Sequence, residues 1–183
     1  MKPLLFQLVI ALSWMLPLPA LAEAPSAEQL LAKAKAKASA ENKTIFLHFG
    51  ASWCGWCKRL DAFLEKDQVK PVFEKYFVPL KLVVQENDKN KALENAGADT
   101  WLQKAGGTGQ GLPFSAFLDA KGGFIATSKA STGNIGYPGE PTEIDFFMQM
   151  MKKAAPNMSE RDAKTLEDVL RSFKNEPAHR PQS

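Results

Sequence analysis

The chain has 183 residues, of which 45% are hydrophobic and 23% charged, and its formal net charge is +3. This is the composition of an ordinary globular protein; it excludes a disordered or collagen-like chain, and the length predicts one domain. Two cysteines are too few for a disulfide scaffold or a four-cysteine zinc site, and 23 basic against 20 acidic residues do not indicate nucleic acid as the main partner.

The first 22 residues have the features of a secretory signal peptide. Lys2 gives a positive end, an apolar run extends from Leu4 to Leu16, and Ala20-Leu21-Ala22 supplies small residues for a signal peptidase. The run is short for a membrane span of about 20 residues, and no cysteine follows that could carry a lipid anchor. We therefore expect cleavage near Ala22, export to the periplasm or secretion, and no stable membrane anchor.

Hydrophobic periodicity and turn residues predict alternating helices and strands in the mature chain. Helices are expected over about 27–40, from Cys54 onward, over about 69–76, within part of 86–105, after Thr142 and after Ser159. Strands are expected at Thr44–Phe49 and Val78–Val84, and a hairpin joins Phe114–Leu118 to Gly123–Thr127. Strands separated by helices and followed by a hairpin predict an α/β fold with a mixed sheet covered by helices.

Capping patterns predict where three of these helices begin. A Ser or Thr is followed three residues later by Gln or Asp, which is typical of a capped helix start. The pairs are Ser26 with Gln29, Thr142 with Asp145, and Ser159 with Asp162. Residues 131–141, before the second of these helices, are expected to form a loop rich in Gly and Pro.

The two cysteines lie in the segment Trp53-Cys54-Gly55-Trp56-Cys57-Lys58, just after a predicted buried strand. Cys54 is expected to cap the following helix, where unpaired amides and the helix dipole stabilise a thiolate and lower its pKa. Cys57 lies one turn further, close enough to bond to Cys54. A disulfide that closes so short a loop restricts the unfolded chain very little. A disulfide that serves only to stabilise the fold is therefore disfavoured. Two thiols and two histidines are also poor material for a zinc site. The pattern predicts thiol–disulfide exchange.

This segment resembles the active site of the thioredoxin superfamily, in the style of exported bacterial proteins with Trp-Cys-x-x-Cys-Lys. The resemblance covers about residues 27–153: Ile45–Phe49 resembles the central strand, and Gly111-Leu112-Pro113-Phe114 resembles the cis-proline loop. It implies a thioredoxin-like domain over about 23–175, with the last predicted helix as an addition and a polar tail at 176–183.

The resemblance also implies roles for residues outside the cysteine pair. Pro113 is expected to be cis and to face the cysteines, Leu112 to offer its backbone to an extended substrate, and Gly136 to line the same groove. His48 stands six residues before Cys54, where many relatives have a buried acid beneath the second cysteine. Its neutral imidazole could accept the proton of Cys57; the alternative is a core histidine bonded to a backbone carbonyl.

Gly55-Trp56 departs from the Gly-Pro of thioredoxins and the Gly-His of disulfide isomerases, so the direction of exchange stays open. Gly55 is expected to let the turn approach closely, and Trp53 and Trp56 to form an apolar rim; packing under the site is the alternative for Trp53. Lys58 completes the motif.

The expected activity is exchange with protein thiols and disulfides, without a cofactor and with a membrane electron donor or an oxidant as a further partner. The alternative is a thioredoxin-fold binding module that holds a partner or copper(I), or senses redox state, without turnover.

Overall fold

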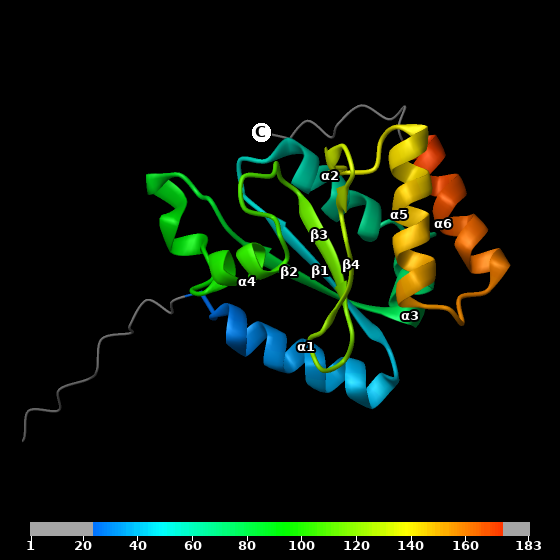
Figure 1. The fold of residues 1–183 in the computed structure, drawn as a ribbon, viewed down its shortest axis with the longest axis horizontal. Coiled ribbons are helices and arrows are strands. Elements are labelled where there is room, and N and C mark those ends of the chain that lie inside the picture. Colours follow the sequence, from blue (N-terminus) through cyan, green and yellow to red (C-terminus); the bar gives the residue numbers. More distant parts are fainter. Residues whose placement is uncertain (1–23, 174–183) are drawn as a thin grey trace, which may run out of the picture.

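The computed structural model describes residues 24–173, and the expected signal peptide and polar tail lie outside them. Its centre is a four-stranded sheet of order β2-β1-β3-β4 (Figure 1). The strands are β1 (Thr44–Gly50), β2 (Phe77–Val83), β3 (Phe114–Leu118) and β4 (Phe124–Thr127). β2 runs parallel to β1, whereas β3 is antiparallel to β1 and β4 to β3. The sheet is therefore mixed, as the sequence predicted.

Helices cover both faces of this sheet (Figure 1). On one face lie α1 (Ala27–Glu41) and α4 (Ala98–Lys104). The other face carries α2 (Gly55–Leu64), α3 (Lys70–Tyr76), α5 (Pro141–Ala154) and α6 (Glu160–Phe173). A 3-10 helix, η1 (Asp88–Leu93), and a small hairpin of β5 (Lys129–Ala130) and β6 (Gly133–Asn134) complete the described elements.

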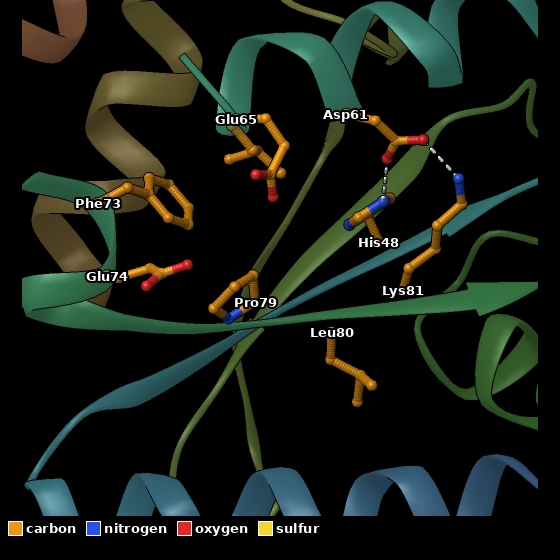
Figure 2. Close-up of a pocket in the computed structure, with 9 residues that line it drawn as sticks. His48, Asp61, Glu65, Phe73, Glu74, Pro79, Leu80 and Lys81 are labelled. Carbon is orange, nitrogen blue, oxygen red and sulfur yellow. Dashed lines mark hydrogen bonds and ion pairs between the residues drawn. The ribbon is translucent and has the colours of Figure 1, made fainter. Parts of the chain in front are cut away.

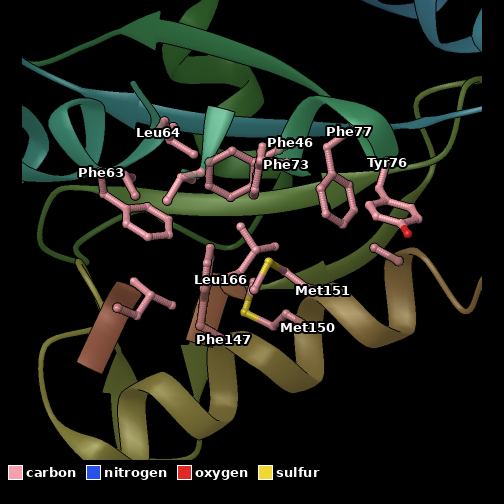
Figure 3. Close-up of a cluster of buried hydrophobic side chains, with 14 of the residues drawn as sticks. Phe46, Phe63, Leu64, Phe73, Tyr76, Phe77, Phe147, Met150, Met151 and Leu166 are labelled. Atoms are coloured by element: carbon pink, nitrogen blue, oxygen red, sulfur yellow. The ribbon is translucent and has the colours of Figure 1, made fainter. Parts of the chain in front are cut away.

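Strand β1 divides the core in two, because successive side chains of a strand point to opposite faces. Ile45, Leu47 and Phe49 pack toward α1 and α4, whereas Phe46 enters the larger cluster under α2, α3, α5 and α6 (Figure 3). Phe46 packs against three other aromatic rings there, with centroids 5.0–5.9 Å away. A fully buried Phe or Leu stabilises a fold by about 1.5–3 kcal/mol, so these faces fix the orientation of β1 and of the loop that follows it.

Every predicted helix and strand is present and in the predicted order, and two of the three capping patterns are confirmed. Ser26 and Gln29 bond reciprocally, and the Ser159 hydroxyl accepts the amide of Asp162 at 3.1 Å.

The third capping prediction, Thr142 with Asp145, is wrong. Helix α5 begins at Pro141, and Glu143 accepts the amide of Glu140 at 2.9 Å. Proline is favoured at the first helical position because its missing N–H has no partner there in any case. The hairpin β5–β6 was also missed inside the predicted loop. Within residues 24–173, none of the helices has the length and apolar character that crossing a bilayer requires.

Candidate active site

Cys54 is the N-cap of α2, as predicted from its position after β1. Its backbone is extended, and its sulfur accepts the amide hydrogen of Cys57 at 3.1 Å. The two sulfurs form a disulfide, with the Cα atoms 5.3 Å apart. Cys54 is 4% exposed and Cys57 is completely buried. Of the two, Cys54 is therefore the more exposed residue, and an N-cap position is one that favours a thiolate when the pair is reduced.

Gly50, the last residue of β1, permits Cys57 to lie against the strand. A Cβ at Gly50 would lie 3.2 Å from Cβ and 3.3 Å from Sγ of Cys57, and 3.5 Å from Cε of Lys81. The two distances to Cys57 are tighter than ordinary contacts, whereas the distance to Lys81 is an ordinary van der Waals contact. The absence of a side chain at Gly50 thus lets Cys57 approach the end of the strand.

The loop before Cys54 is tied to the segment that follows β2. Glu86 is 7% exposed, and its carboxylate accepts the backbone amide of Ser52 at 2.5 Å and the Ser52 hydroxyl at 2.7 Å. Asn90 also donates to that hydroxyl, at 2.9 Å, and the indole N–H of Trp53 donates to the carbonyl of Gln85 at 2.8 Å. The sequence interpretation missed Glu86. In the sequence, a contact between Glu86 and this loop was indicated only by its position just after a strand parallel to β1, since the carboxyl ends of two parallel strands lie at the same edge of the sheet.

His48 is buried in β1, as expected, and its partner is a carboxylate of α2 (Figure 2). Its Nε2 lies 3.0 Å from Oδ1 of Asp61, and Oδ2 of Asp61 accepts from Nζ of Lys81 at 2.5 Å. Lys81 is the residue of β2 directly opposite His48, and Asp61 lies one helical turn after Cys57. The expectation of a backbone carbonyl as the partner of a core histidine is therefore wrong.

The charges in this cluster follow from burial and from these bonds. Burial lowers the pKa of His48, although its hydrogen bond to the Asp61 carboxylate acts in the opposite direction. Burial raises the pKa of Asp61, but the hydrogen bonds from His48 and Lys81 outweigh it and leave the pKa below its usual value. At neutral pH the imidazole is neutral and the carboxylate is ionised. Nδ1 of His48 has no hydrogen-bond partner among the described residues.

A groove of about 290 Å³ is lined in part by Trp56, which lies between the two cysteines in the sequence. Leu112 packs against the cluster of Ala51 and the two cysteines, and it lines the groove together with Trp56, Ile135, Gly136 and Tyr137. The Leu112–Pro113 bond is cis, as the resemblance implied, and Gly136 has a positive φ of 61°. The structure thus brings Leu112 and Gly136 to the same groove, and Leu112 also contacts the cysteine pair.

Two of the expected motif roles are tested by the side chains around α2. Trp56 is 59% exposed and stacks on Tyr137, with centroids 6.0 Å apart, while the guanidinium of Arg59 lies 5.4 Å from the Tyr137 ring. Trp53 is 55% exposed, so it does not pack under the site. The steric role expected of Gly55 is wrong, because a Cβ there would meet nothing within 4 Å. Lys58 is exposed on α2.

This chain matches a known protein family. The profile of a family described as thioredoxin-like matches residues 26–120. The chain belongs to this thioredoxin-like family. None of the curated proteins compared with it matches.

Three solved structures are similar to this thioredoxin-like protein at low identity. A disulphide isomerase from Xylella fastidiosa Temecula1 is 22% identical with a TM-score of 0.49, covering 87% of this chain and 99% of its own. The C-terminal domain of DsbD from Neisseria meningitidis, in the oxidised form, is 20% identical with a TM-score of 0.43, covering 70% and 99%. A protein described as DsbH oxidoreductase is 20% identical with a TM-score of 0.39, covering 76% and 92%.

Within residues 24–173 there is no group of three or more His, Cys, Asp or Glu side chains that could hold a metal ion. In the disulfide form both sulfurs are bonded to each other, so neither is a thiolate ligand.

Proposed function

We propose that this thioredoxin-like protein exchanges thiols and disulfides with protein substrates through Cys54 and Cys57, after export from the cytoplasm. The observation that carries the proposal is the position of Cys54 as N-cap of α2, with Cys57 completely buried one turn behind it. This arrangement separates the more exposed thiol, which acts as the nucleophile, from a fully protected second thiol.

The exchange proceeds in two substitutions at sulfur. In the reduced protein, the Cys54 thiolate attacks one sulfur of a substrate disulfide; that bond breaks, and the other substrate sulfur leaves as a thiolate. Cys57 then loses its proton and attacks Cys54 in the mixed disulfide. The second substrate thiolate leaves, and the Cys54–Cys57 disulfide forms. Run in reverse, the same steps oxidise a substrate dithiol and return two electrons to the pair.

Cys57 is buried, so its proton needs an internal acceptor before the second step. We assign that role to the cluster of Asp61, His48 and Lys81. Asp61 follows Cys57 by four residues, so their side chains share one face of α2. Its carboxylate is ionised, because the pKa of Asp61 lies below its usual value, and His48 holds it from the strand side. His48 thus supports the acceptor and is not bonded to either sulfur.

The direction of exchange depends on the reduction potential of the pair and on a partner that resets it. A reduction potential of about −270 mV indicates a reductant, and a reduction potential of about −120 mV indicates an oxidant. A reductant outside the cytoplasm requires an electron donor, which we expect in the membrane, and an oxidant requires an electron acceptor. The protein itself needs no cofactor for either substitution.

The test is turnover of a protein disulfide substrate, such as insulin, by the purified chain. Cys54→Ser is expected to abolish turnover, whereas Cys57→Ser is expected to accumulate a mixed disulfide with the substrate. Alkylation at mildly acidic pH should modify Cys54 much faster than Cys57 in the reduced protein. Equal alkylation of both thiols contradicts the division of labour.

A parallel titration with copper(I) tests the alternative binding function. Tight copper(I) binding by the reduced protein, combined with no turnover of insulin, would favour a binding module. Export is tested separately by the mass of the protein recovered from the periplasm or medium, which should correspond to cleavage near Ala22.

A further inference from the structure

Asn134, in the short strand β6, joins two loops that border the groove. Its Nδ2 donates to the carbonyl of Gly111 at 2.6 Å and to the carbonyl of Pro113 at 2.9 Å. Its Oδ1 accepts from the Ser128 hydroxyl at 2.7 Å and from the amide of Gly136 at 3.1 Å. Two donors and two acceptor positions are all that an asparagine amide possesses. A single side chain therefore connects the Gly111–Pro113 loop to the Gly136 loop and uses its whole bonding capacity to do so.

The two carbonyls that Asn134 holds are those on either side of Leu112. Leu112 contacts the cluster of Ala51 and the two cysteines, and it lines the groove. Within residues 24–173, the N–H and C=O of Leu112 have no hydrogen-bond partner in the protein. A backbone donor and acceptor are thus left beside Cys54, between two carbonyls that are fixed from behind.

We propose that Asn134 is a positioning residue for the substrate. It holds Gly111, Pro113 and Gly136 so that Leu112 presents its backbone to an extended polypeptide segment next to the substrate disulfide. The inference rests on the proposed exchange function and on the expected pairing of Leu112 with a substrate main chain, and it adds Asn134 as the residue that fixes this pairing site. Pairing of this kind requires a peptide backbone on the partner. A small disulfide without a peptide chain needs access to Cys54 alone.

Because the hydrogen bonds of Asn134 fix both loops, the binding surface is ordered before the substrate arrives. A loop that must be ordered on binding weakens affinity, whereas a loop already fixed does not carry that cost. Since Asn134 does not touch Cys54 or Cys57, its effect is on substrate binding and not on the reactivity of the sulfurs.

The experiment compares two variants of Asn134 on two substrates. Asn134→Asp keeps the acceptor oxygen Oδ1 but removes both donors and places a second oxygen against the carbonyls of Gly111 and Pro113. Asn134→Ala removes all four hydrogen bonds. Asn157→Ala, at an exposed asparagine between α5 and α6, is the control. The substrates are insulin and the small aromatic disulfide DTNB. For both Asn134 variants we expect the KM for insulin to rise by about tenfold, the effect of losing one or two hydrogen bonds.

The rate with DTNB, the alkylation rate of Cys54 and the reduction potential should stay at the values of the unmodified protein. An unchanged KM for insulin in a folded Asn134→Asp protein overturns the inference, and so does an equal loss with both substrates. If Asn134→Ala does not fold, Asn134→Ser, which keeps one donor, should give an intermediate KM. If the unmodified protein exchanges neither disulfide, it is the proposed function that fails; if it exchanges both and the variants match it, only the role of Asn134 fails.

Discussion

Nε2 of His48 lies 3.0 Å from Oδ1 of Asp61, and this bond joins the central strand β1 to helix α2 one turn beyond Cys57. By the resemblance, His48 stands at a strand position where many relatives have a buried acid. The carboxylate comes instead from the helix, and the strand supplies the imidazole that holds it. Lys81 completes the arrangement from the neighbouring strand.

The first prediction concerns Asp61 as the proton acceptor for Cys57. Asp61→Asn keeps the shape of the side chain but cannot accept a proton near neutral pH. Because general-base catalysis contributes about 10²–10⁴-fold, we expect resolution of the mixed disulfide to slow by about 100-fold or more. Stopped-flow measurement of that second step, with alkylation of Cys54 as a separate readout that should hardly change, checks the prediction.

The matched control is Asp67→Asn, an exposed acid in the segment between α2 and α3. It should resolve the mixed disulfide at the rate of the unmodified protein. If Asp61→Asn also retains that rate, Asp61 has a structural role and Cys57 loses its proton by another route.

The second prediction concerns the pH dependence of stability that His48 causes. Burial lowers the pKa of His48 in the folded protein, whereas the unfolded chain has a histidine pKa of about 6.5. Below that pH the unfolded state binds a proton that the folded state resists, so stability is complete above about pH 6.5 and is lost as the pH falls. One proton corresponds to at most about 1.4 kcal/mol per pH unit. Urea unfolding between pH 5 and 8 should show this slope.

His48→Leu removes the titrating ring and serves as the comparison. Its free energy of unfolding should be less dependent on pH between about 5 and 6.5. The depressed pKa of Asp61 acts in the same direction, but its effect appears only below the usual carboxylate range near about pH 4. Parallel curves for the two proteins would show that His48 is not the source of the acid sensitivity.

Local signals in the sequence were sufficient for most of the fold and for the cysteine pair. The apolar run at Thr44–Phe49 predicted β1, and Cys54 with Cys57 after it predicted the helix start and the disulfide. Each of these depends on neighbours within one or two turns. Thr142 shows the limit even of local signals, because Pro141 and Glu143 competed for the same helix start and set it earlier.

The residues that the sequence did not reveal are those whose contacts depend on the pairing of strands that are far apart in the sequence. Lys81 reaches Asp61 because β2 pairs with β1 in the register that places it opposite His48. Glu86 reaches Ser52 for the same reason, 34 residues away in sequence. Asn134 lay in a segment that composition described only as a loop. A polar residue in a polar stretch has no periodicity to distinguish it, so its partners emerge only once strand register is known.

The third prediction concerns Gly107, because the side chains packed around it leave no room for a larger residue. A Cβ there would lie 2.3 Å from Cδ1 of Leu102 and 3.0 Å from the ring of Phe114. Overpacking of this kind costs about 1–3 kcal/mol, so Gly107→Ala should lower the free energy of unfolding by that amount. Gly111→Ala in the same loop is the control, since a Cβ there meets nothing within 4 Å. Equal stabilities in urea would show that Leu102 moves aside without cost.

The last prediction concerns the added helix α6, which is attached to α3 by a carboxylate as well as by its buried leucines. Oδ2 of Asp162 accepts from the Tyr76 hydroxyl at 2.5 Å and from Nζ of Lys75 at 2.7 Å. The hydrogen bonds from Lys75, Tyr76 and Ser159 lower the pKa of Asp162 to about 2. A depressed carboxylate pKa stabilises the fold above the unfolded value near about pH 4 and ceases to do so as the pH falls toward the folded value.

Asp162→Asn should therefore melt at a lower temperature than the unmodified protein at pH 6, and the difference should shrink as the pH is lowered toward 2. Asp168→Asn, which removes an acid paired with Lys164 on the same helix, is the control and should leave the melting temperature nearly unchanged. Thermal melts of the three proteins across this pH range measure the effect. If the difference in melting temperature between Asp162→Asn and the unmodified protein stays constant with pH, the asparagine disturbs packing, and the charge of Asp162 does not hold α6 against α3.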